Sequence, residues 1–311
     1  MVNSILLIIS KKLGLDAVKT IYSMYPEKIK GIVTINDEED IRSSFSDIVA
    51  YSEERSIDLN IIKNQTEFAE IIKLKKPDLC FVLGWYWIIN ESVLKEVPFG
   101  FIGIHASLLP KYRGFSPIVW TIINGEKESG VSLFYFESGV DSGDIIDQKK
   151  FLIGEDEYVS DILLKVEAIV MQLLEENLPM IVKDVADKTK QNHKLASYCG
   201  QRQPKHGLIN WSDTNKNIYN LIRALAPPYP GAFSFINKKK IVILNVSIIE
   251  NEYYGIPGLV VKKDSEHVII CCGKGAICVN QVRLDSGEIK KATDVLKYNN
   301  QLGWSFLPQW E

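Results

Sequence analysis

Short apolar runs alternate with helix-like segments along the first half of the chain, and this alternation constrains the fold more than any other feature. Ser4–Ser10 and Ile29–Ile35 are β-branched runs typical of buried strands, and an amphipathic pattern runs from Leu15 to Tyr25 between them. A further helix pattern covers Thr66–Leu74, and further strand patterns cover Leu79–Leu83, Phe101–His105, Gly130–Glu137 and Ile145–Ile153. This spacing predicts an α/β fold with a mostly parallel sheet and helices on both faces.

The chain changes character after a long helix pattern at Asp156–Leu178. Lys183–Pro204 is polar and rich in Lys, Gln and Asp, as expected of a linker. A helix pattern at Asn217–Leu225 then ends at a proline cluster, and the short strand patterns beyond it predict a small antiparallel barrel or sandwich. We therefore divide the chain into an N-terminal domain at 1–190, a linker at 191–205 and a C-terminal domain at 206–311.

Composition argues against several classes of protein. The apolar run Ile5–Ile9 is too short for a signal peptide, and Leu79–Ile89 is shorter than the ~18 residues of a membrane span. Five cysteines are an odd number scattered over a large chain, without the paired C-x-x-C spacing of zinc sites. We expect reduced thiols, no metal, no membrane and a cytoplasmic location.

Charge and motifs narrow the possible ligands. The formal net charge is −3, with about −6 in residues 1–205 and about +3 in 206–311, so no dense basic stripe predicts binding to nucleic acid. No G-x-G-x-x-G follows the first strand and no G-x-x-x-x-G-K-[ST] occurs. Neither a nicotinamide cofactor nor a P-loop nucleotide site is predicted.

Two polar segments follow strands where an open parallel sheet places its ligands, at the carboxyl ends of the strands. They are GIHASLLPKYRG at 103–114 and ESGVDSGDI at 137–145. Of the four histidines, only His105 stands at the end of a predicted strand. A lone histidine in such a place is more often a satisfied or exposed loop residue, so its neighbours decide the interpretation.

The string HASLLPKYRG, followed 36 residues after its histidine by the aspartate of GVDSGDI, resembles the 10-formyltetrahydrofolate-dependent formyltransferases. The resemblance continues in SYCGQRQPKHGLINW at 197–211 and IYNLIRALAPPYPGA at 218–232, and it spans roughly residues 75–245. It implies a Rossmann-like catalytic domain and a small C-terminal β-rich, OB-like domain. It also implies direct transfer of a formyl group from 10-formyltetrahydrofolate, the co-substrate, to an amine.

The residue types suit this chemistry. Attack on a formyl carbon requires a neutral amine, and histidine is a suitable base because its unperturbed pKa of ~6.5 lies near working pH. A carboxylate can orient the imidazole and stabilise the imidazolium; by resemblance Asp141 takes that place, with Asp144 as the rival.

One position departs from the family pattern. Most members carry an asparagine two residues before the histidine, to donate a hydrogen bond to the developing oxyanion, and this chain has Gly103 there. Loss of one such donor typically lowers the rate by ~10²–10³. A protonated His105, a backbone N–H or a water is the expected substitute at this third catalytic position.

The resemblance also predicts the remaining site residues. For the folate pocket these are Leu83, Trp85, Tyr86, Ile88, Glu137, Gly139, Val140 and Asp141. For the acceptor substrate they are Ser107, Lys111, Arg113, Arg223 and Tyr229. The tryptophans are equally consistent with core packing, Lys111 and Arg113 with a solvated loop, and the terminal aromatics Trp304, Phe306 and Trp310 with packing.

Three amines come into question. Glycinamide ribonucleotide enzymes generally stop after the first domain, and methionyl-tRNA formyltransferases need a basic tRNA surface. The segments GQRQP at 200–204 and PYPGA at 228–232 look more like the sugar enzymes, which leads us to predict a nucleotide-linked amino-sugar N-formyltransferase of surface-polysaccharide biosynthesis. The alternatives are a methionyl-tRNA formyltransferase and, because of Gly103, a non-catalytic protein that binds folate or a sugar nucleotide. The oligomeric state stays open, with a homodimer suggested by the sugar members.

Overall fold

The computed structural model describes residues 1–85 and 87–303, which form two compact units. One unit comprises residues 1–117, 128–152 and 163–200, and the other comprises 118–127, 153–162 and the chain from 201 onward. This division is discontinuous, because two short segments pack with the C-terminal part of the chain; the domain boundaries at 190 and 205 stay a prediction. Tyr86 and the terminal aromatics from Trp304 onward lie outside the described residues.

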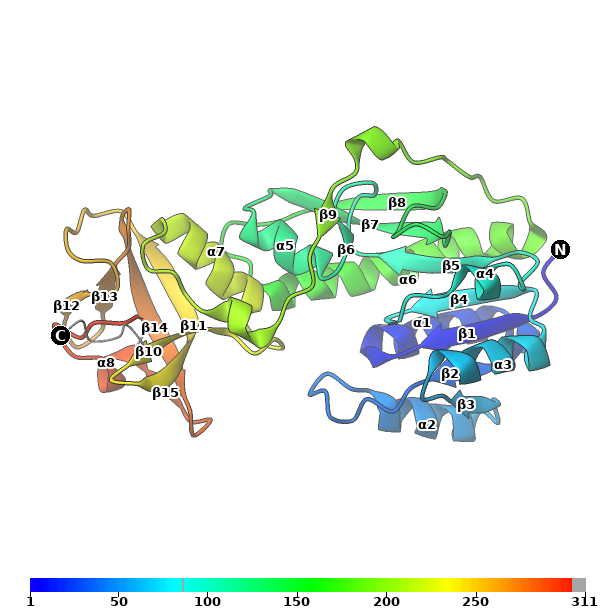
Figure 1. Ribbon diagram of the computed structural model, residues 1–311, viewed down its shortest axis with the longest axis horizontal. Helices are drawn as coiled ribbons and strands as arrows, with labels where there is room; N and C mark the ends of the chain where they lie inside the picture. The colour runs from blue at the N-terminus through cyan, green and yellow to red at the C-terminus, as the bar shows by residue number, and fades with distance from the viewer. Residues whose placement is uncertain (86, 304–311) are drawn as a thin grey trace. The chain divides into compact units, whose positions relative to one another are not determined.

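Seven strands of the first unit form one sheet in the order β3-β2-β1-β4-β5-β7-β8 (Figure 1). Their bounds are β1 Ile5–Ile9, β2 Ile29–Thr34, β3 Leu59–Ile61, β4 Leu79–Leu83, β5 Phe101–His105, β7 Glu128–Tyr135 and β8 Ile145–Leu152. Strands β1 to β5 are parallel, whereas β7 pairs antiparallel with both β5 and β8. The predicted mostly parallel sheet is confirmed.

Helices cover both faces of this sheet. The helices of the first unit are α1 Lys11–Met24, α2 Phe45–Glu54, α3 Gln65–Lys75, α4 Glu91–Leu94 and most of α6 Val159–Lys183, whereas α5 Pro117–Ile123 belongs to the second unit from Ile118 onward. On one face Leu6 and Ile8 of β1 pack with Phe68 of α3. Successive strand residues point to opposite faces, and all five residues of β1 are buried, so the other face is covered as well. Near-continuous apolar strands of this kind are typical of a parallel sheet between two helix layers.

The order of the strands reverses beside β1. The chain first adds β2 and β3 on one side and then returns to add β4 and β5 on the other. In open α/β sheets this reversal separates the loops at the carboxyl ends of the strands and leaves a crevice between them. The fold therefore predicts a ligand site at the carboxyl ends of β4 and β5. None of the helices in residues 1–85 and 87–303 has the length and apolar composition needed to span a membrane.

The second unit is a small antiparallel sheet packed on one helix, as predicted for the β-rich C-terminal part. Its elements are α7 Asn215–Leu225, β10 Ala232–Ile236, β11 Lys239–Ile249, β12 Val260–Lys263, β13 Val268–Cys271, β14 Ala276–Leu284, β15 Ile289–Lys291 and α8 Ala292–Val295. The strand order is β10-β11-β14-β13-β12, with β15 beside β14. Single bridges from Leu259 to Gln301 and from Phe235 to Gly303 join the two sides of the sheet, which gives it a barrel-like closure.

Helix α7 has the cap, the apolar face and the terminating prolines from which a helix can be predicted. The Thr214 side chain caps it by accepting a hydrogen bond from the backbone N–H of Asn217. Its apolar face, which includes Ile218 and Ile222, is buried. The helix ends at Leu225, shortly before the prolines that cannot continue it.

Candidate active site

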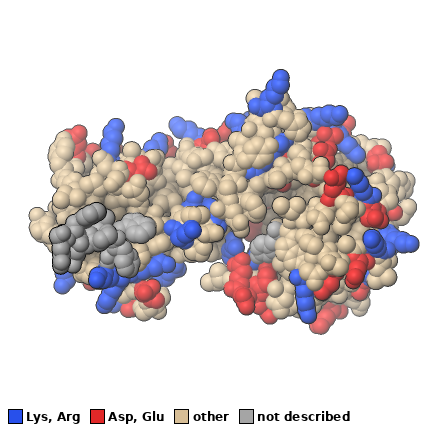
Figure 2. Space-filling view, in the orientation of Figure 1, with Lys and Arg blue, Asp and Glu red and all other residues tan. Residues whose placement is uncertain are grey.

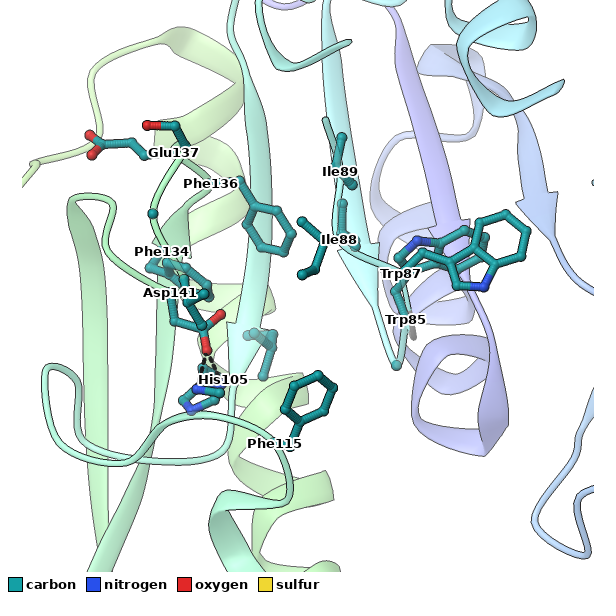
Figure 3. A pocket seen from close by; sticks show the side chains of 17 residues that line it. Trp85, Trp87, Ile88, Ile89, His105, Phe115, Phe134, Phe136, Glu137 and Asp141 are labelled. Carbon is teal, nitrogen blue, oxygen red and sulfur yellow. Dashed lines mark hydrogen bonds and ion pairs between the residues drawn. The ribbon is translucent and has the colours of Figure 1, made fainter. Parts of the chain in front are cut away.

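His105 is the last residue of β5, and Asp141 lies in the loop that joins β7 to β8. The two side chains meet: His105 Nδ1 is 3.4 Å from Asp141 Oδ2. Figure 3 shows the carboxylate pointing at the imidazole ring. The backbone N–H of Gly114 donates to the same carboxylate oxygen over 2.7 Å. The sequence prediction that these two residues come together thus agrees with the geometry.

The other ring nitrogen of His105 also faces an acceptor. Its Nε2 lies 2.7 Å from the carbonyl oxygen of Tyr112. Because a carbonyl oxygen accepts and never donates, Nε2 carries a hydrogen in this arrangement. A neutral ring then turns the lone pair of Nδ1 toward Asp141, whereas an imidazolium donates from both nitrogens. The surroundings therefore stabilise the ring after it has taken up a proton at Nδ1.

A pocket adjoins this pair at the carboxyl ends of β4 and β5 (Figure 3). Its walls come from the segment after β4, the end of β5 and the loop that follows β7. The lining residues are Val82, Gly84, Trp85, Trp87, Ile88, Ile89, Ile104, His105, Gly114, Phe115, Phe134, Phe136, Glu137, Ser138, Gly139, Val140 and Asp141. Mostly apolar walls with a few convergent polar groups are typical of a site for a small organic molecule.

The residues expected to bind folate are largely found on this lining. Trp85 and Ile88 come from the segment after β4, and Glu137, Gly139 and Val140 come from the loop after β7. Leu83 differs: it is fully buried in β4 and does not line the pocket. Trp87, for which pocket and core were equally expected, also lines it. Phe115 and Phe136 line it without having been predicted, since an isolated aromatic residue in a sequence does not distinguish a pocket wall from core.

Gly103 does not reach the pocket, because Phe136 occupies the space beside it. A Cβ atom placed on Gly103 would lie 2.2 Å from Cε1 and 2.8 Å from Cζ of the Phe136 ring. It would also lie 3.1 Å from the carbonyl oxygen of Val82. The ring of Phe136 stacks on Phe134 with 5.2 Å between their centroids. The absent side chain is therefore matched by a large neighbour, and β5 offers no side-chain donor at this position.

The residues expected to bind the acceptor have other environments. The Ser107 hydroxyl is fully buried and donates to the backbone carbonyl of Lys111 over 2.6 Å. The Lys111 side chain is exposed and does not line the pocket. Arg113, expected to bind the acceptor or to lie on a solvated loop, is instead 2% exposed, with Gln191, His193 and Tyr198 as side-chain partners.

Arg223 and Tyr229 belong to the second unit. The Arg223 guanidinium is buried and donates to the backbone carbonyls of Gly154 and Glu157 over 3.1 and 2.8 Å. Burial lowers its pKa. These contacts give Arg223 a packing role, while Tyr229 is only partly buried.

No group of three or more His, Cys, Asp or Glu side chains gathers as a set of metal ligands in the part of the chain that the structure describes. Asp144, the rival of Asp141, is not among the residues that line the pocket.

Comparison with known families shows which family the chain belongs to. A family model for formyl transferase matches residues 28–178, and a model for the formyl transferase C-terminal domain matches residues 202–300. The chain belongs to the formyltransferase family. It is an enzyme that transfers formyl groups.

Among curated relatives, a methionyl-tRNA formyltransferase of Acetivibrio thermocellus is 32% identical over 221 residues, covering 71% of each chain. The bifunctional polymyxin resistance protein ArnA of Wigglesworthia glossinidia brevipalpis is 36% identical over 253 residues, 80% of this chain but only 38% of that protein. An N-formyltransferase of Helicobacter canadensis, solved with folinic acid and dTDP-3-aminofucose, superposes with a TM-score of 0.67 at 23% identity. That superposition covers 90% of this chain and 99% of the other, and it shows a shared fold.

Proposed function

We propose that this enzyme transfers the formyl group of 10-formyltetrahydrofolate to the amine of a nucleotide-linked amino sugar. The observation that carries the catalytic part is the contact of His105 with Asp141 on one side and with the Tyr112 carbonyl on the other. The arrangement suits a base, because each N–H of the protonated ring has an acceptor.

The pocket fits the donor. Folate presents a flat fused ring with a polar edge, and the lining offers aromatic and aliphatic walls from Trp85, Ile88 and Phe136 together with the backbone of 137–141. A protein solved with folinic acid shares this fold. When bound there, the folate supplies the formyl group.

The residues of the chain then handle one proton. As the amine nitrogen forms its bond to the formyl carbon, its proton passes to Nδ1 of His105. The Asp141 carboxylate stabilises the positive charge of the ring, and the Gly114 N–H holds that carboxylate in place. The ring later returns the proton to the folate nitrogen as the bond between that nitrogen and the formyl carbon breaks, so no covalent enzyme intermediate is needed.

The sugar acceptor is supported by the segments at 200–204 and 228–232 and by the H. canadensis protein. On the face shown in Figure 2, basic and acidic side chains are interspersed rather than gathered into a basic stripe. The net charge of −3 agrees with a small acceptor better than with a polyanion. Methionyl-tRNA is the second candidate, because methionyl-tRNA formyltransferases are among the relatives.

Incubation of the protein with 10-formyltetrahydrofolate and a panel of UDP- and dTDP-linked amino sugars, or with methionyl-tRNA, separates these candidates. Tetrahydrofolate release is followed by absorbance and the formylated product by mass spectrometry. We expect product from at least one sugar. Product from methionyl-tRNA alone would replace the sugar by the tRNA, and product from neither would identify a non-catalytic binding protein.

The roles of the pair are tested with matched carboxylate variants. We expect His105→Ala and Asp141→Asn each to lower kcat by ~10² or more, the usual contribution of a positioned acid–base group, while folate still binds. Asp144→Asn is the control, because Asp144 lies three positions away and does not line the pocket. Near-normal turnover by Asp141→Asn, or an equal loss in Asp144→Asn, would refute the assignment.

A further inference from the structure

The segment from Thr189 to Cys199, much of which was expected to be a linker, is bound along the first unit. Thr189 and Ile145 exchange two backbone hydrogen bonds of 2.8 Å, just beyond the loop that carries Asp141. Tyr198 and Cys199 form strand β9, which pairs in parallel with β6, residues Arg113 and Gly114. The segment therefore contacts both stretches of chain that hold the catalytic pair.

Gln191 is the buried polar side chain of this segment that faces Asp141, and it is 6% exposed. Its Nε2 donates to the backbone carbonyl of Asp141 over 2.9 Å and to that of Gly143 over 2.7 Å. Its Oε1 accepts from Nε and Nη2 of Arg113 over 3.1 and 2.5 Å. Both amide hydrogens and the amide oxygen are thus engaged, and the orientation of the amide group is fixed by its partners.

Arg113 is an unusual partner, because it is buried without a carboxylate. Its guanidinium contacts Gln191, His193 Nδ1 at 3.1 Å and the Tyr198 hydroxyl at 3.2 Å, and it forms no ion pair with the described residues. A buried charge without a counter-charge is destabilising unless its donors form hydrogen bonds. Here two of the donors converge on a single oxygen, that of Gln191.

The backbone at Asp141 needs such support. Asp141 has a φ of +46°, in the left-handed region that is strained for a residue other than glycine. The residues on either side of Arg113 complete the arrangement: the Tyr112 carbonyl faces His105, and the Gly114 N–H holds the Asp141 carboxylate. The backbone of residues 112–114 thus contacts both the His105 ring and the Asp141 carboxylate. The Arg113 side chain, through Gln191, also holds the backbone carbonyl of Asp141.

We propose that Gln191, oriented by Arg113, is a positioning residue that fixes the peptide of Asp141 and thereby aims its carboxylate at His105. The inference rests on the proposed function only in that the pair performs the proton transfer. In this proposal the segment 189–199 does more than connect two parts of the chain: it holds the loop that carries Asp141.

A double-mutant cycle tests this in the full-length enzyme. Gln191→Ala should lower kcat by about 10- to 100-fold and leave the KM of both substrates within about threefold. Combined with Asp141→Asn, it should lower kcat by less than about twofold further, because its effect passes through Asp141. An equal fold-loss in the wild-type and Asp141→Asn backgrounds, or an unchanged kcat, overturns the proposal.

Asn177→Ala is the matched control for loss of a partly buried amide. Asn177 also donates to two oxygens, Asp147 Oδ2 and the Leu173 carbonyl, both at 2.9 Å, but does not line the pocket. We expect it to lower Tm without lowering kcat. If Gln191→Ala does not fold, Arg113→Lys serves in its place, since an ammonium cannot donate the two hydrogen bonds that Oε1 of Gln191 accepts.

An NMR measurement tests the positioning role of Gln191 without any need to know the acceptor substrate. The four histidines make the ring nitrogens of His105 assignable by ¹⁵N NMR. Gln191→Ala should move the His105 nitrogen signals in the same direction as Asp141→Asn, and Asn177→Ala should leave them in place. Should no amine be formylated, the proposed function fails while this measurement still decides the positioning role; unmoved signals in Gln191→Ala would overturn it.

Discussion

The packing of Phe136 against Gly103 allows a quantitative prediction for Gly103→Asn. A carbon added at position 103 would stand 2.2 Å from the Phe136 ring, whereas carbon–carbon contacts in proteins lie near 3.5 Å or more. The ring edge must therefore withdraw by roughly 1.3 Å. Phe134, Leu109 and Ile145 pack around it and resist that movement.

Overpacking of this kind costs about 1–3 kcal/mol. For a unit of this size each kcal/mol lowers Tm by about 2–4 °C. We expect Gly103→Asn to lower Tm by about 2–12 °C, measured by calorimetry, and to raise kcat in no assay, even though it restores the asparagine typical of the family. Phe136→Ala clears the space. In that background we expect Gly103→Asn to cost at least 1 kcal/mol less, and the asparagine to raise kcat about tenfold or more over Phe136→Ala alone, because an oxyanion donor is worth up to ~10²–10³.

The two backgrounds make the reasoning refutable. A Gly103→Asn variant with the wild-type Tm would show that Phe136 does not hold this space. Equal destabilisation by Gly103→Asn in the wild-type and Phe136→Ala backgrounds would show the same. A faster Gly103→Asn single variant would show that the ring yields easily and that the missing donor limits the wild-type rate.

Two further predictions concern stability. Arg223→Met should lower the unfolding free energy by about 2–4 kcal/mol, since it leaves the carbonyls of Gly154 and Glu157 without a buried donor. It should leave the KM for the acceptor unchanged, and a raised KM would show that Arg223 does bind the acceptor. Hydrogen bonds from Arg42, and then from Lys11, hold the pKa of Asp40 well below its usual range. A carboxyl with a lowered folded-state pKa adds stability above about pH 4 and loses it progressively as pH falls from about 4 through the folded-state pKa. In urea unfolding, Asp40→Asn should therefore be less stable than wild type at pH 7, and the difference should start to shrink only below about pH 4.

The sequence predicted the elements whose apolar period is strong. β1, β4 and β5 are near-continuous apolar runs, and parallel pairing brings their carboxyl ends to one edge of the sheet. From that edge and the family pattern, His105 and Asp141 followed. α2 and β3 were not anticipated, because β3 is only three residues long and few residues of either element are buried.

Arg113 shows what a local pattern cannot reveal. In a string such as LPKYRG an arginine reads as a solvated loop residue, yet here it is buried against Gln191, 78 positions further along the chain. Phe136 is a similar case. It meets Gly103 only because β7 pairs antiparallel with β5 in a register that sets Phe134 opposite Gly103. Both contacts depend on tertiary pairing, and no local propensity encodes them.

The contacts of Phe136 with Gly103 and of Arg113 with Gln191 also affect how the negative charge on the formyl oxygen is stabilised during transfer. With Gly103 beside Phe136, position 103 of β5 contributes no side-chain donor, and the N–H of Gly114 already donates to Asp141. In the proposed mechanism, the His105 imidazolium would stabilise a developing oxyanion through its charge, because its two N–H groups face Asp141 and the Tyr112 carbonyl. Its orientation depends on Asp141, and the loop of Asp141 depends on Gln191. An enzyme that lacks one donor should therefore lose more from a displaced Asp141 than a relative with the asparagine, since the same ring must both hold the proton and stabilise the oxyanion.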